Sequence, residues 1–448
     1  MGRSGFASRF VIARHVVEIF FPQRPELGLE QSQYSPTVID KIVSANAEHK
    51  SAAKAKKMLL KLSEVSVTEP IIHKLTAVIG AELQTHMQQQ ASACSEQQLD
   101  PQYPETPRVA AVAVDGGRIM TREKAGRGVH DQQWKETKVS CLLNMSSSPS
   151  EEDPHPELPS CFANKKYVER LVRELHTVRS GTQESLENSG NEAEIEEILD
   201  QVLESGNLSS QEREKSNWRP KRLMRTCVSS MASSDDFGPL VAGEAQRRGF
   251  YDAPRQAFLG DGLGWNWTLH KTYFSDFVAI VDFVHPLSYI YNAAQVIAPD
   301  NPWSFYLQAS TDCWQGRVAD LLERLRAWQA THPNLTNETL PDHDPREIVR
   351  TAVTYLTNNQ KRMDYPAYRK EGLPVSTSMI ESLIKEINYR VKGTEKFWNR
   401  PDGAETILQV RAAALCDDDR LSEWIRNRPG SYYYRRGTAA SESLVTAS

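Results

Sequence analysis

Two short apolar stretches of this sequence end in the same way, with an aspartate that is followed by glycine. The first is Val109-Ala-Ala-Val-Ala-Val-Asp115-Gly-Gly, and the second is Ala257-Phe-Leu-Gly-Asp261-Gly. Short apolar runs bounded by glycine are typical of buried β-strands. A carboxylate that directly follows such a strand lies at the carboxyl edge of a sheet, where ligands bind. We therefore expect a buried sheet with Asp115 and Asp261 at one edge, although an Asp-Gly turn is the alternative for either residue alone.

A third acid, Glu381, opens the helical stretch Glu381-Ser-Leu-Ile-Lys-Glu-Ile-Asn-Tyr-Arg. Glu381, Lys385, Asn388 and Lys392 recur at helical spacing, so they share one face of the predicted helix. An acid aligned with two lysines and an asparagine suits contact with a DNA backbone. The alternative is an ordinary Glu–Lys helix pair, which stabilises a helix by only tenths of a kcal/mol. Glu386 is the alternative acid, and it lies on a different face.

Three gathered carboxylates repel one another, and none stays ionised easily without a counter-charge. Asp115, Asp261 and Glu381 are therefore predicted to bind two Mg²⁺ ions, for which Mn²⁺ would substitute, because Mg²⁺ prefers oxygen ligands. Ions about 3.5–4 Å apart in such sites activate the attacking oxygen and stabilise the leaving oxygen. The three acids thus predict a site that cuts and joins phosphodiester bonds.

Asp282 and His285 form an Asp-x-x-His pair at the end of a further predicted strand, residues 277–284. A histidine at this edge can hydrogen-bond a carboxylate or a scissile phosphate, so both residues are candidates for the catalytic site. The alternative is a capping aspartate beside a histidine whose hydrogen bonds are satisfied within the core.

The charge of the chain is unevenly distributed, although its net value is only −5. The stretch Glu184–Glu204 is strongly acidic, whereas basic residues gather at 219–225, 385–400 and 426–436. Such clusters suit nucleic acid, and solvated faces are the alternative. Tryptophans beside basic or candidate active-site segments can stack on unpaired bases, although core packing is the commoner role. They are Trp134, Trp265, Trp267 and Trp398.

Two function classes are disfavoured by the sequence. No run of about 18 uncharged apolar residues is present, so we expect no membrane span. The six cysteines are scattered and include no Cys-x-x-Cys pair, which argues against a disulfide framework and a zinc ribbon. A reducing, cytoplasmic compartment fits best.

The pattern predicts several segments along the chain. Residues 1–105 read as helical, with helices over 36–45, 54–62 and 68–80 and a polar linker over 88–107. Short helices with tight turns suit a helix-turn-helix module that binds DNA ends, although generic helical packing is commoner.

Residues 106–299 are predicted as the first part of a catalytic core that contains a mobile acidic insertion over 180–215. Its strands are predicted over 109–115, 118–122, 136–145, 256–260 and 277–284, with a tight turn at Gly116-Gly117. A helical insertion over 300–360, a second core part over 361–415 that carries Glu381, and a basic tail over 416–448 follow. Helices are predicted over 164–177, 237–248, 285–297, 317–331 and 344–359.

Several motifs together resemble one family. They are Val114-Asp-Gly-Gly-Arg118, Trp134-Lys-Glu-Thr-Lys138, Phe258-Leu-Gly-Asp-Gly262, Asp282-Phe-Val-His285, Met363-Asp-Tyr-Pro366, Ser376-Thr-Ser-Met-Ile-Glu-Ser382 and Val391-Lys-Gly-Thr-Glu-Lys-Phe-Trp398. Over roughly residues 28–430 the chain resembles transposases of bacterial insertion sequences, in the Kra-type group allied to the Mutator-like elements.

The resemblance implies an α/β protein with a ribonuclease-H-like mixed sheet of the retroviral integrase type, a helical insertion and an N-terminal helical domain. It implies an Asp/Asp/Glu triad of Asp115, Asp261 and Glu381, with Asp282 and His285 as the signature after the second acid. The partners would be double-stranded DNA, at element ends and target, in a homodimer or larger assembly at the bacterial nucleoid. Arg118, Lys385, Asn388, Lys392 and Trp398 are the predicted DNA contacts. A standalone nuclease of the same fold and a non-catalytic DNA-binding protein are the alternatives.

Overall fold

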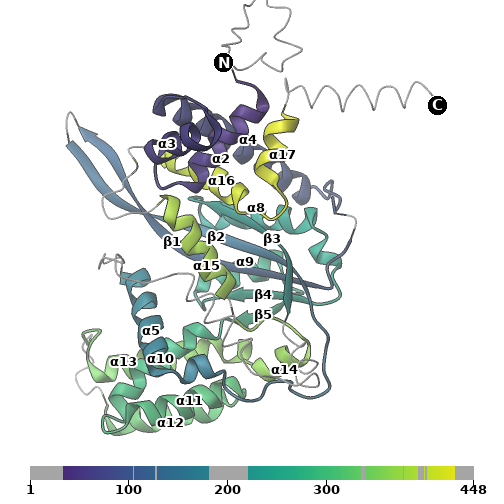
Figure 1. Cartoon of the computed structure of the whole chain (residues 1–448). Helices are drawn as coiled ribbons and strands as arrows, with labels where there is room; N and C mark the ends of the chain where they lie inside the picture. Colours follow the sequence, from purple (N-terminus) through teal and green to yellow (C-terminus); the bar gives the residue numbers. More distant parts are fainter. Residues whose placement is uncertain are drawn as a thin grey trace, which may run out of the picture. The chain divides into compact units, whose positions relative to one another are not determined.

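The computed structural model describes residues 34–103, 105–126, 129–180, 220–333, 340–376, 378–391, 398 and 401–428. Within these ranges the side chains of residues 123–132, 174, 176–180, 378–382 and 385 are not described. The chain forms two compact units, one of Met1–Thr85 with Asp402–Ser448 and the other of His86–Pro401 (Figure 1).

The larger unit, His86–Pro401, is built on a mixed sheet with the strand order β3-β2-β1-β4-β5. Strands β1, β2 and β3 are joined antiparallel, whereas β4 and β5 continue from β1 as parallel neighbours. The expectation of an α/β protein with a mixed sheet is therefore confirmed. The strands are β1 (Val109–Gly126), β2 (Val129–Ser146), β3 (Lys221–Ser230), β4 (Gln256–Gly260) and β5 (Val278–Val281).

The predicted turn at Gly116-Gly117 is wrong, because β1 continues through both glycines. Gly116 pairs with Lys138 and Gly117 pairs with Thr137 in the antiparallel ladder to β2. A Cβ on Gly117 would lie 2.8 Å from Oγ1 of Thr137, so the glycine makes room for a neighbouring side chain. The two strands predicted over 109–115 and 118–122 are thus one strand, and β3 was not predicted.

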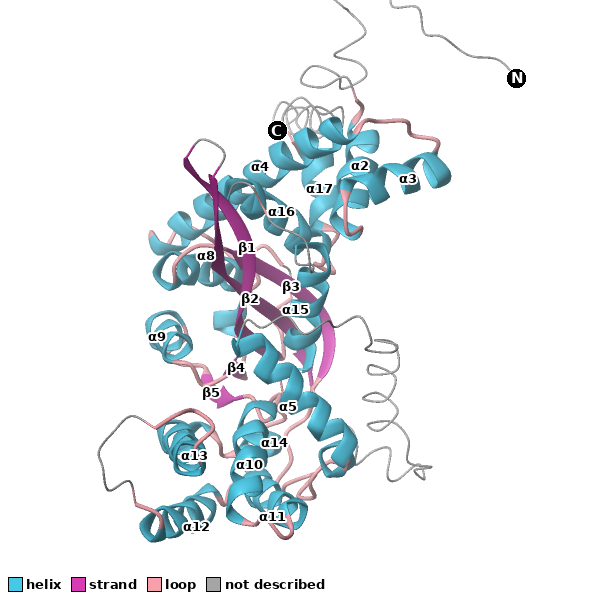
Figure 2. Ribbon diagram, turned by 90° about the vertical axis from the view of Figure 1, so that its left-hand side faces the viewer, coloured by secondary structure: helices cyan, strands magenta, loops and turns pink. Residues whose placement is uncertain are grey.

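Helices lie on both faces of the sheet (Figure 2). On one face, α8 (Ser234–Arg247) and α9 (Gly264–Tyr273) bury Phe237, Val241 and Leu269 against Val112 and Val114 of β1. On the other face, α15 (Ser378–Val391) packs against β1 and β2. Side chains alternate between the two faces of a strand, and helices cover both faces of β1. This explains why the sequence of β1 is apolar without alternation.

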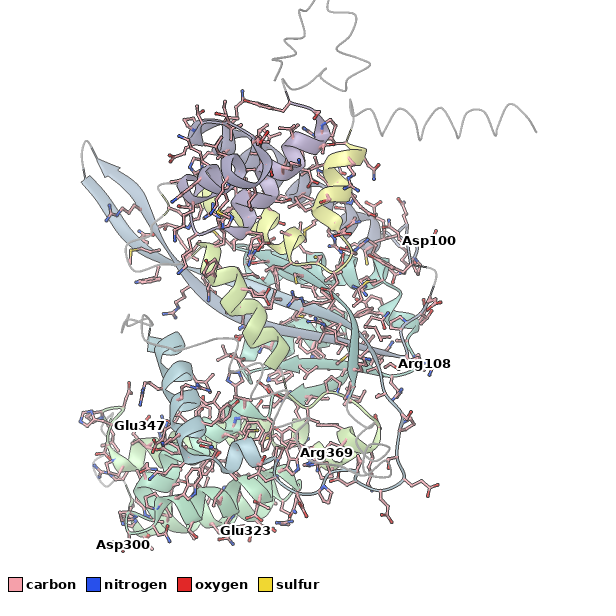
Figure 3. The ribbon with its side chains drawn as sticks, in the orientation of Figure 1. Asp100, Arg108, Asp300, Glu323, Glu347 and Arg369 are labelled. Carbon is pink, nitrogen blue, oxygen red and sulfur yellow. The ribbon has the colours of Figure 1, made fainter. Side chains whose placement is uncertain are left out.

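A helical region completes the larger unit and includes the predicted insertion. Arg369, labelled in Figure 3, is fully buried there. Its Nε donates to Oδ1 of Asp153 over 2.8 Å, and its guanidinium lies 4.1 Å from the ring centroid of Trp314. The elements of this region are η1 (Ser160–Ala163), α5 (Lys165–Ser180), α10 (Val284–Ile297), α11 (Pro302–Trp314), α12 (Val318–Thr331), α13 (Pro345–Asn359), η5 (Gln360–Arg362) and α14 (Tyr365–Lys370). The remaining short element of the unit is η4 (Phe250–Asp252).

The smaller unit joins helices from both ends of the chain. Ile39 and Val43 share one hydrophobic cluster with Val410, Leu421 and Ile425. The helices are α2 (Pro36–Glu48), α3 (Ala52–Ser63), α4 (Glu69–Ser95) as far as Thr85, α16 (Pro401–Ala414) from Asp402, and α17 (Arg420–Asn427). Two boundaries differ from those predicted: α4 runs into the expected linker as far as Ser95, and residues 402–427 group with the N-terminal helices rather than with a core part or a tail.

In the part of the chain that the structure describes, no helix is both long and apolar enough to cross a membrane.

Candidate active site

Three aspartates occupy matching positions on the three parallel strands. Ala113 of β1 pairs with Leu259 of β4, and Gly260 of β4 pairs with Val281 of β5. Asp115 and Asp261 each lie two residues beyond the paired Ala113 and Leu259, and Asp282 directly follows Val281. Neighbouring strands lie about 4.7–4.9 Å apart, so the register brings these acids to one edge of the sheet.

The Asp261 carboxylate is held in one orientation by neutral donors. Its Oδ1 accepts hydrogen bonds from the backbone N–H of Leu263 over 2.9 Å and from Nδ2 of Asn266 over 2.5 Å. Asp261 is 9% exposed and Asn266 is fully buried. Among the described residues, nothing donates to Oδ2 and no lysine or arginine pairs with this carboxylate. Asp261 therefore presents one unbonded oxygen from a fixed position.

Glycine is required on each side of Asp261, for a different reason at each position. A Cβ on Gly260 would lie 2.7 Å from Nδ2 of Asn266, so glycine is required for Asn266 to reach the carboxylate. Gly262 has a φ of +97°, a backbone conformation that L side chains rarely adopt. The hydroxyl of Tyr355 also donates to the main-chain oxygen of Asp261 over 2.8 Å. Together these contacts define the geometry of the Phe258–Gly262 motif.

Asp282 and His285 follow β5 and are more deeply buried than Asp261. Asp282 is fully buried, and its Oδ1 accepts from the backbone N–H of Val284 over 3.3 Å. Nε2 of His285 lies 3.6 Å from Oδ2 of Asp282, whereas Nδ1 of His285 is buried and has no partner among the described residues. Asp282 thus accepts from the first residue of α10, and among the described residues His285 has one ring nitrogen without a partner.

Asp115 faces the side of the sheet that α15 covers. Arg225 of β3 pairs with Leu143 of β2, which in turn pairs with Ala111 of β1, so these side chains share one face. Nη1 of Arg225 donates to Oε1 of Glu386 on α15 over 3.1 Å. Because side chains alternate along β1, Asp115 projects to the same face as Ala111. Its Oδ1 accepts from the N–H of Gly116 over 2.6 Å.

The predicted third acid lies on the helix that covers this face. The backbone of Glu381 belongs to α15, and the N–H of Phe283 donates to the main-chain oxygen of Val375 over 3.1 Å. This bond brings the segment that leads into α15 to the end of β5, beside Asp282. The side chain of Glu381 lies outside the described residues, so its place in the triad stays a prediction. Glu386, the alternative acid, is engaged by Arg225.

The predicted DNA contacts are spread over several elements. Arg118 is exposed on β1, and Asn388 is partly buried on α15. The N–H of Trp398 donates to the main-chain oxygen of Met120 over 3.0 Å, and its indole Nε1 donates to that of Val391 over 3.0 Å. Trp398 therefore extends the edge of β1 and contacts the end of α15. The side chain of Lys385 and the whole of Lys392 lie outside the described residues.

Sequence reasoning missed the two side chains that hydrogen-bond to Asp261. Asn266 and Tyr355 are ordinary polar residues of helices α9 and α13, and Tyr355 lies far along the chain from Asp261. For Asn266 a signal was available in the sequence, namely its short spacing from Asp261 and the glycine, Gly260, that precedes Asp261. Among the side chains that the structure describes, no three of the His, Cys, Asp and Glu type are grouped as metal ligands.

Comparison with known proteins does not assign the chain to a family. No protein-family model matches it, and no curated protein matches it.

Proposed function

We propose that this protein is a DNA transposase that cleaves the ends of an insertion sequence and joins them to target DNA. The observation that supports the proposal is the register of β1 and β4, in which Ala113 pairs with Leu259 and Asp115 and Asp261 each follow two residues later. The helix that bears Glu381 covers the face to which Asp115 projects. This arrangement supports a three-carboxylate phosphodiester site.

The finer fold type is part of the same proposal. An antiparallel meander of β1, β2 and β3, followed by parallel strands β4 and β5, supports a ribonuclease-H-like sheet. The resemblance to transposases of bacterial insertion sequences implies that sheet type, with acids on the first and fourth strands. Asp115 and Asp261 each come after the stretch over which β1 and β4 pair with each other, which supports the proposal.

The donor set at this edge fits divalent cations. Asp261 is nearly buried, and no cationic side chain among the described residues neutralises it. An isolated buried carboxylate is costly, and a metal ion would offset that cost. Asp115, Asp261 and Glu381 would hold two Mg²⁺ ions, or Mn²⁺, through oxygen ligands. Bound there, the ions would supply activation of the attacking oxygen and stabilisation of the leaving oxygen.

The chain's own residues would hold the acids and the DNA. Asn266 fixes the orientation of Asp261, and Nε2 of His285 lies 3.6 Å from Oδ2 of Asp282. In the smaller unit, α3 presents a basic surface that suits contact with DNA phosphates. Its lysines Lys54, Lys56, Lys57 and Lys61 are exposed, and no acid lies within Ala52–Ser63. Two element ends must be joined, so the active form would be a dimer or larger assembly.

The test is a strand-transfer assay with a supercoiled plasmid that carries the DNA flanking the gene on both sides. With Mg²⁺ present, the wild-type protein should nick and join the ends of the cloned segment. Asp115→Asn, Asp261→Asn and Glu381→Gln should each reduce cleavage by at least about a thousandfold, as expected when a metal-binding group essential to the chemistry is lost. DNA binding should persist in all three variants.

A matched control is Asp276→Asn, which changes an exposed aspartate in the loop after α9. This variant should cleave like the wild type. Cleavage without joining would favour a standalone nuclease, and binding without cleavage would favour a non-catalytic DNA-binding protein. Retained cleavage in all three acid variants would eliminate the assignment of these carboxylates.

A further inference from the structure

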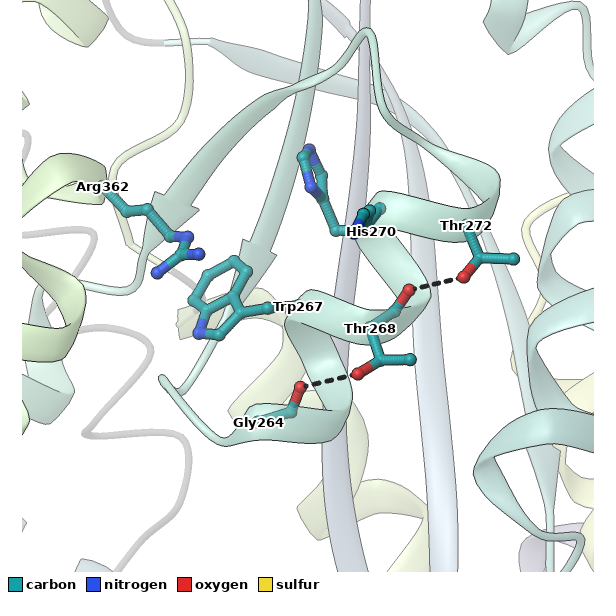
Figure 4. Close-up of a pocket in the computed structure, with 7 residues that line it drawn as sticks. Gly264, Trp267, Thr268, His270, Thr272 and Arg362 are labelled. Atoms are coloured by element: carbon teal, nitrogen blue, oxygen red, sulfur yellow. Dashed lines mark hydrogen bonds between the residues drawn. The ribbon is translucent and has the colours of Figure 1, made fainter.

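An open hollow runs along α9, the helix that begins directly after the Asp261 loop (Figure 4). Trp267, Lys271 and Arg362 contribute its aromatic and cationic lining, and no carboxylate is among its described lining residues. Gly264, the first residue of α9, also lines the hollow and lies three residues after Asp261. The residues that line the hollow therefore begin close in sequence to the candidate active site.

Arg362 is fixed over an aromatic ring. Its guanidinium lies 4.3 Å from the ring centroid of Trp267, and Figure 4 shows the two groups facing each other. Nε1 of Trp267 donates to Oδ1 of Asn359 over 3.2 Å, which holds the indole in place. Nη1 of Arg362 donates to the main-chain oxygen of Asn358 over 3.2 Å. The remaining guanidinium donors have no acceptor among the described residues.

The positive charge of this hollow is not neutralised by the described part of the protein. Neither Arg362 nor Lys271 forms an ion pair with a described carboxylate. Arg362 is half-buried, and this burial lowers its pKa, an effect that the nearby Tyr368 opposes only in part. A bound anion would therefore relieve the cost of holding this cation partly out of water.

The hydroxyl groups in the hollow are already engaged. Oγ1 of Thr268 donates to the main-chain oxygen of Gly264 over 3.3 Å, and Oγ1 of Thr272 donates to that of Thr268 over 2.8 Å (Figure 4). His270 also lines the hollow, and its Nε2 lies 2.8 Å from the main-chain oxygen of Phe277. The cationic groups with which an anion can pair there are Arg362 and Lys271. Lys271 lies one helical turn after Trp267, so both residues project from the same side of α9.

We propose that Arg362, held by Trp267, and Lys271 form a phosphate-binding site for the DNA strand that passes the acidic edge. The inference rests on the proposed function, because it takes DNA as the substrate. A planar guanidinium stacked on an aromatic ring retains donors for phosphate oxygens. The 10 residues of α9 extend about 15 Å, comparable with the rise of roughly four nucleotides of one strand.

The experiment measures how the affinity for DNA depends on salt. Binding of a fluorescein-labelled duplex is followed by anisotropy over a series of KCl concentrations, in EDTA so that no cleavage occurs. Arg362→Gln and Lys271→Gln should each weaken binding about tenfold and reduce the slope of log affinity against log salt by about one, because each removes one phosphate contact. Lys361→Gln is the matched control: Lys361 is exposed on η5 next to Arg362 and does not line the hollow.

One further variant and the exposure of Lys271 make the result decisive. Arg362→Lys keeps the charge but loses the planar stack, so it should recover part of the salt slope and little of the affinity. Lys271 is exposed, so its glutamine variant reports on the site even if Arg362→Gln unfolds. Unchanged slopes in both glutamine variants, or losses matched by Lys361→Gln, would overturn the proposal.

The two proposals fail separately. If the wild type shows no strand transfer but the glutamine variants lose the salt slope, the phosphate site stands and the transposase assignment falls. If strand transfer is observed and the slopes are unchanged, only the phosphate site falls. A wild-type protein that binds no duplex DNA would overturn both.

Discussion

Asn266 holds the carboxylate of Asp261 through a 2.5 Å hydrogen bond from its Nδ2. The amide is fully buried, and Gly260 leaves the space that its side chain occupies. Because Oδ1 of Asp261 is thereby occupied, Oδ2 is the oxygen left to face a cation. This contact makes the acidic edge a fixed arrangement whose parts can be tested separately.

Replacing Asn266 by leucine should damage both stability and metal binding. The change removes a buried donor to a carboxylate, which should lower the free energy of unfolding by about 1–3 kcal/mol. Mn²⁺ binding, measured by isothermal titration calorimetry without DNA, should weaken because Asp261 loses its orientation. Asn358→Leu, at an exposed asparagine of α13, is the control. Equal Mn²⁺ affinity in the two variants would argue against a positioning role.

Gly260→Ala should destabilise the larger unit by overpacking. The new Cβ would lie 2.7 Å from Nδ2 of Asn266, so the amide would have to move away from Asp261. Such overpacking typically costs about 1–3 kcal/mol, which urea unfolding can measure. At Gly264 an added Cβ meets nothing within 4 Å, and Gly264→Ala should leave stability unchanged or slightly raised. A similar loss in both variants would contradict the steric explanation.

Arg369→Met should be among the most destabilising single changes in the helical region. The guanidinium is fully buried, pairs with Asp153 and donates to the main-chain oxygen of Trp314. Removing one partner of a buried ion pair typically costs about 3–5 kcal/mol. Arg346→Met breaks a surface pair with Asp344 and should cost much less, because surface ion pairs contribute little to stability. Comparable losses in thermal or urea unfolding would show that the Arg369 contact is not special.

The Asp153–Arg369 pair should also make the free energy of unfolding depend on pH. Partial burial would raise the pKa of Asp153, but hydrogen bonds from the Arg369 guanidinium and the His155 N–H lower it overall. A lowered folded-state pKa contributes stability above the unfolded value of about 3.9, and this contribution is lost as pH falls through the folded pKa.

The measurement compares the wild type with Asp153→Asn in urea unfolding between neutral and acidic pH. The wild type should be more stable at neutral pH, and the difference should shrink as pH falls below about 3.9. A difference that stays constant across this range would show that the carboxylate charge does not matter.

Local patterns predicted a large part of this structure. Strand β4 was predicted at its observed bounds, and the predictions for α10, α12 and α13 differ by a single residue at the start. These elements contain their own signals, namely short apolar runs for the strands and apolar residues at helical spacing for the helices. Asp115 and Asp261 were singled out because each follows such a run.

Other features depend on partners distant in the sequence. Two adjacent glycines favour a turn when only their near neighbours are considered, so Gly116-Gly117 was predicted as a turn. In the folded chain, pairing with Lys138 and Thr137 continues β1 through both glycines. The basic start of β3 disguised a strand that forms a ladder with its distant partner β2. Likewise, nothing local in α17 shows that Leu421 and Ile425 pack with Ile39 and Val43.

The sequence by itself determined which residue types stand at strand ends and helix faces, since short-range propensity and periodicity depend only on near neighbours. Only the tertiary structure decided the register that pairs Ala113 with Leu259 ahead of the two acids, the reach of Asn266 and Tyr355 to the second acid, and the stack of Arg362 on Trp267. Those relationships join segments that come together only when the chain folds, because they depend on strand pairing and side-chain packing between distant parts.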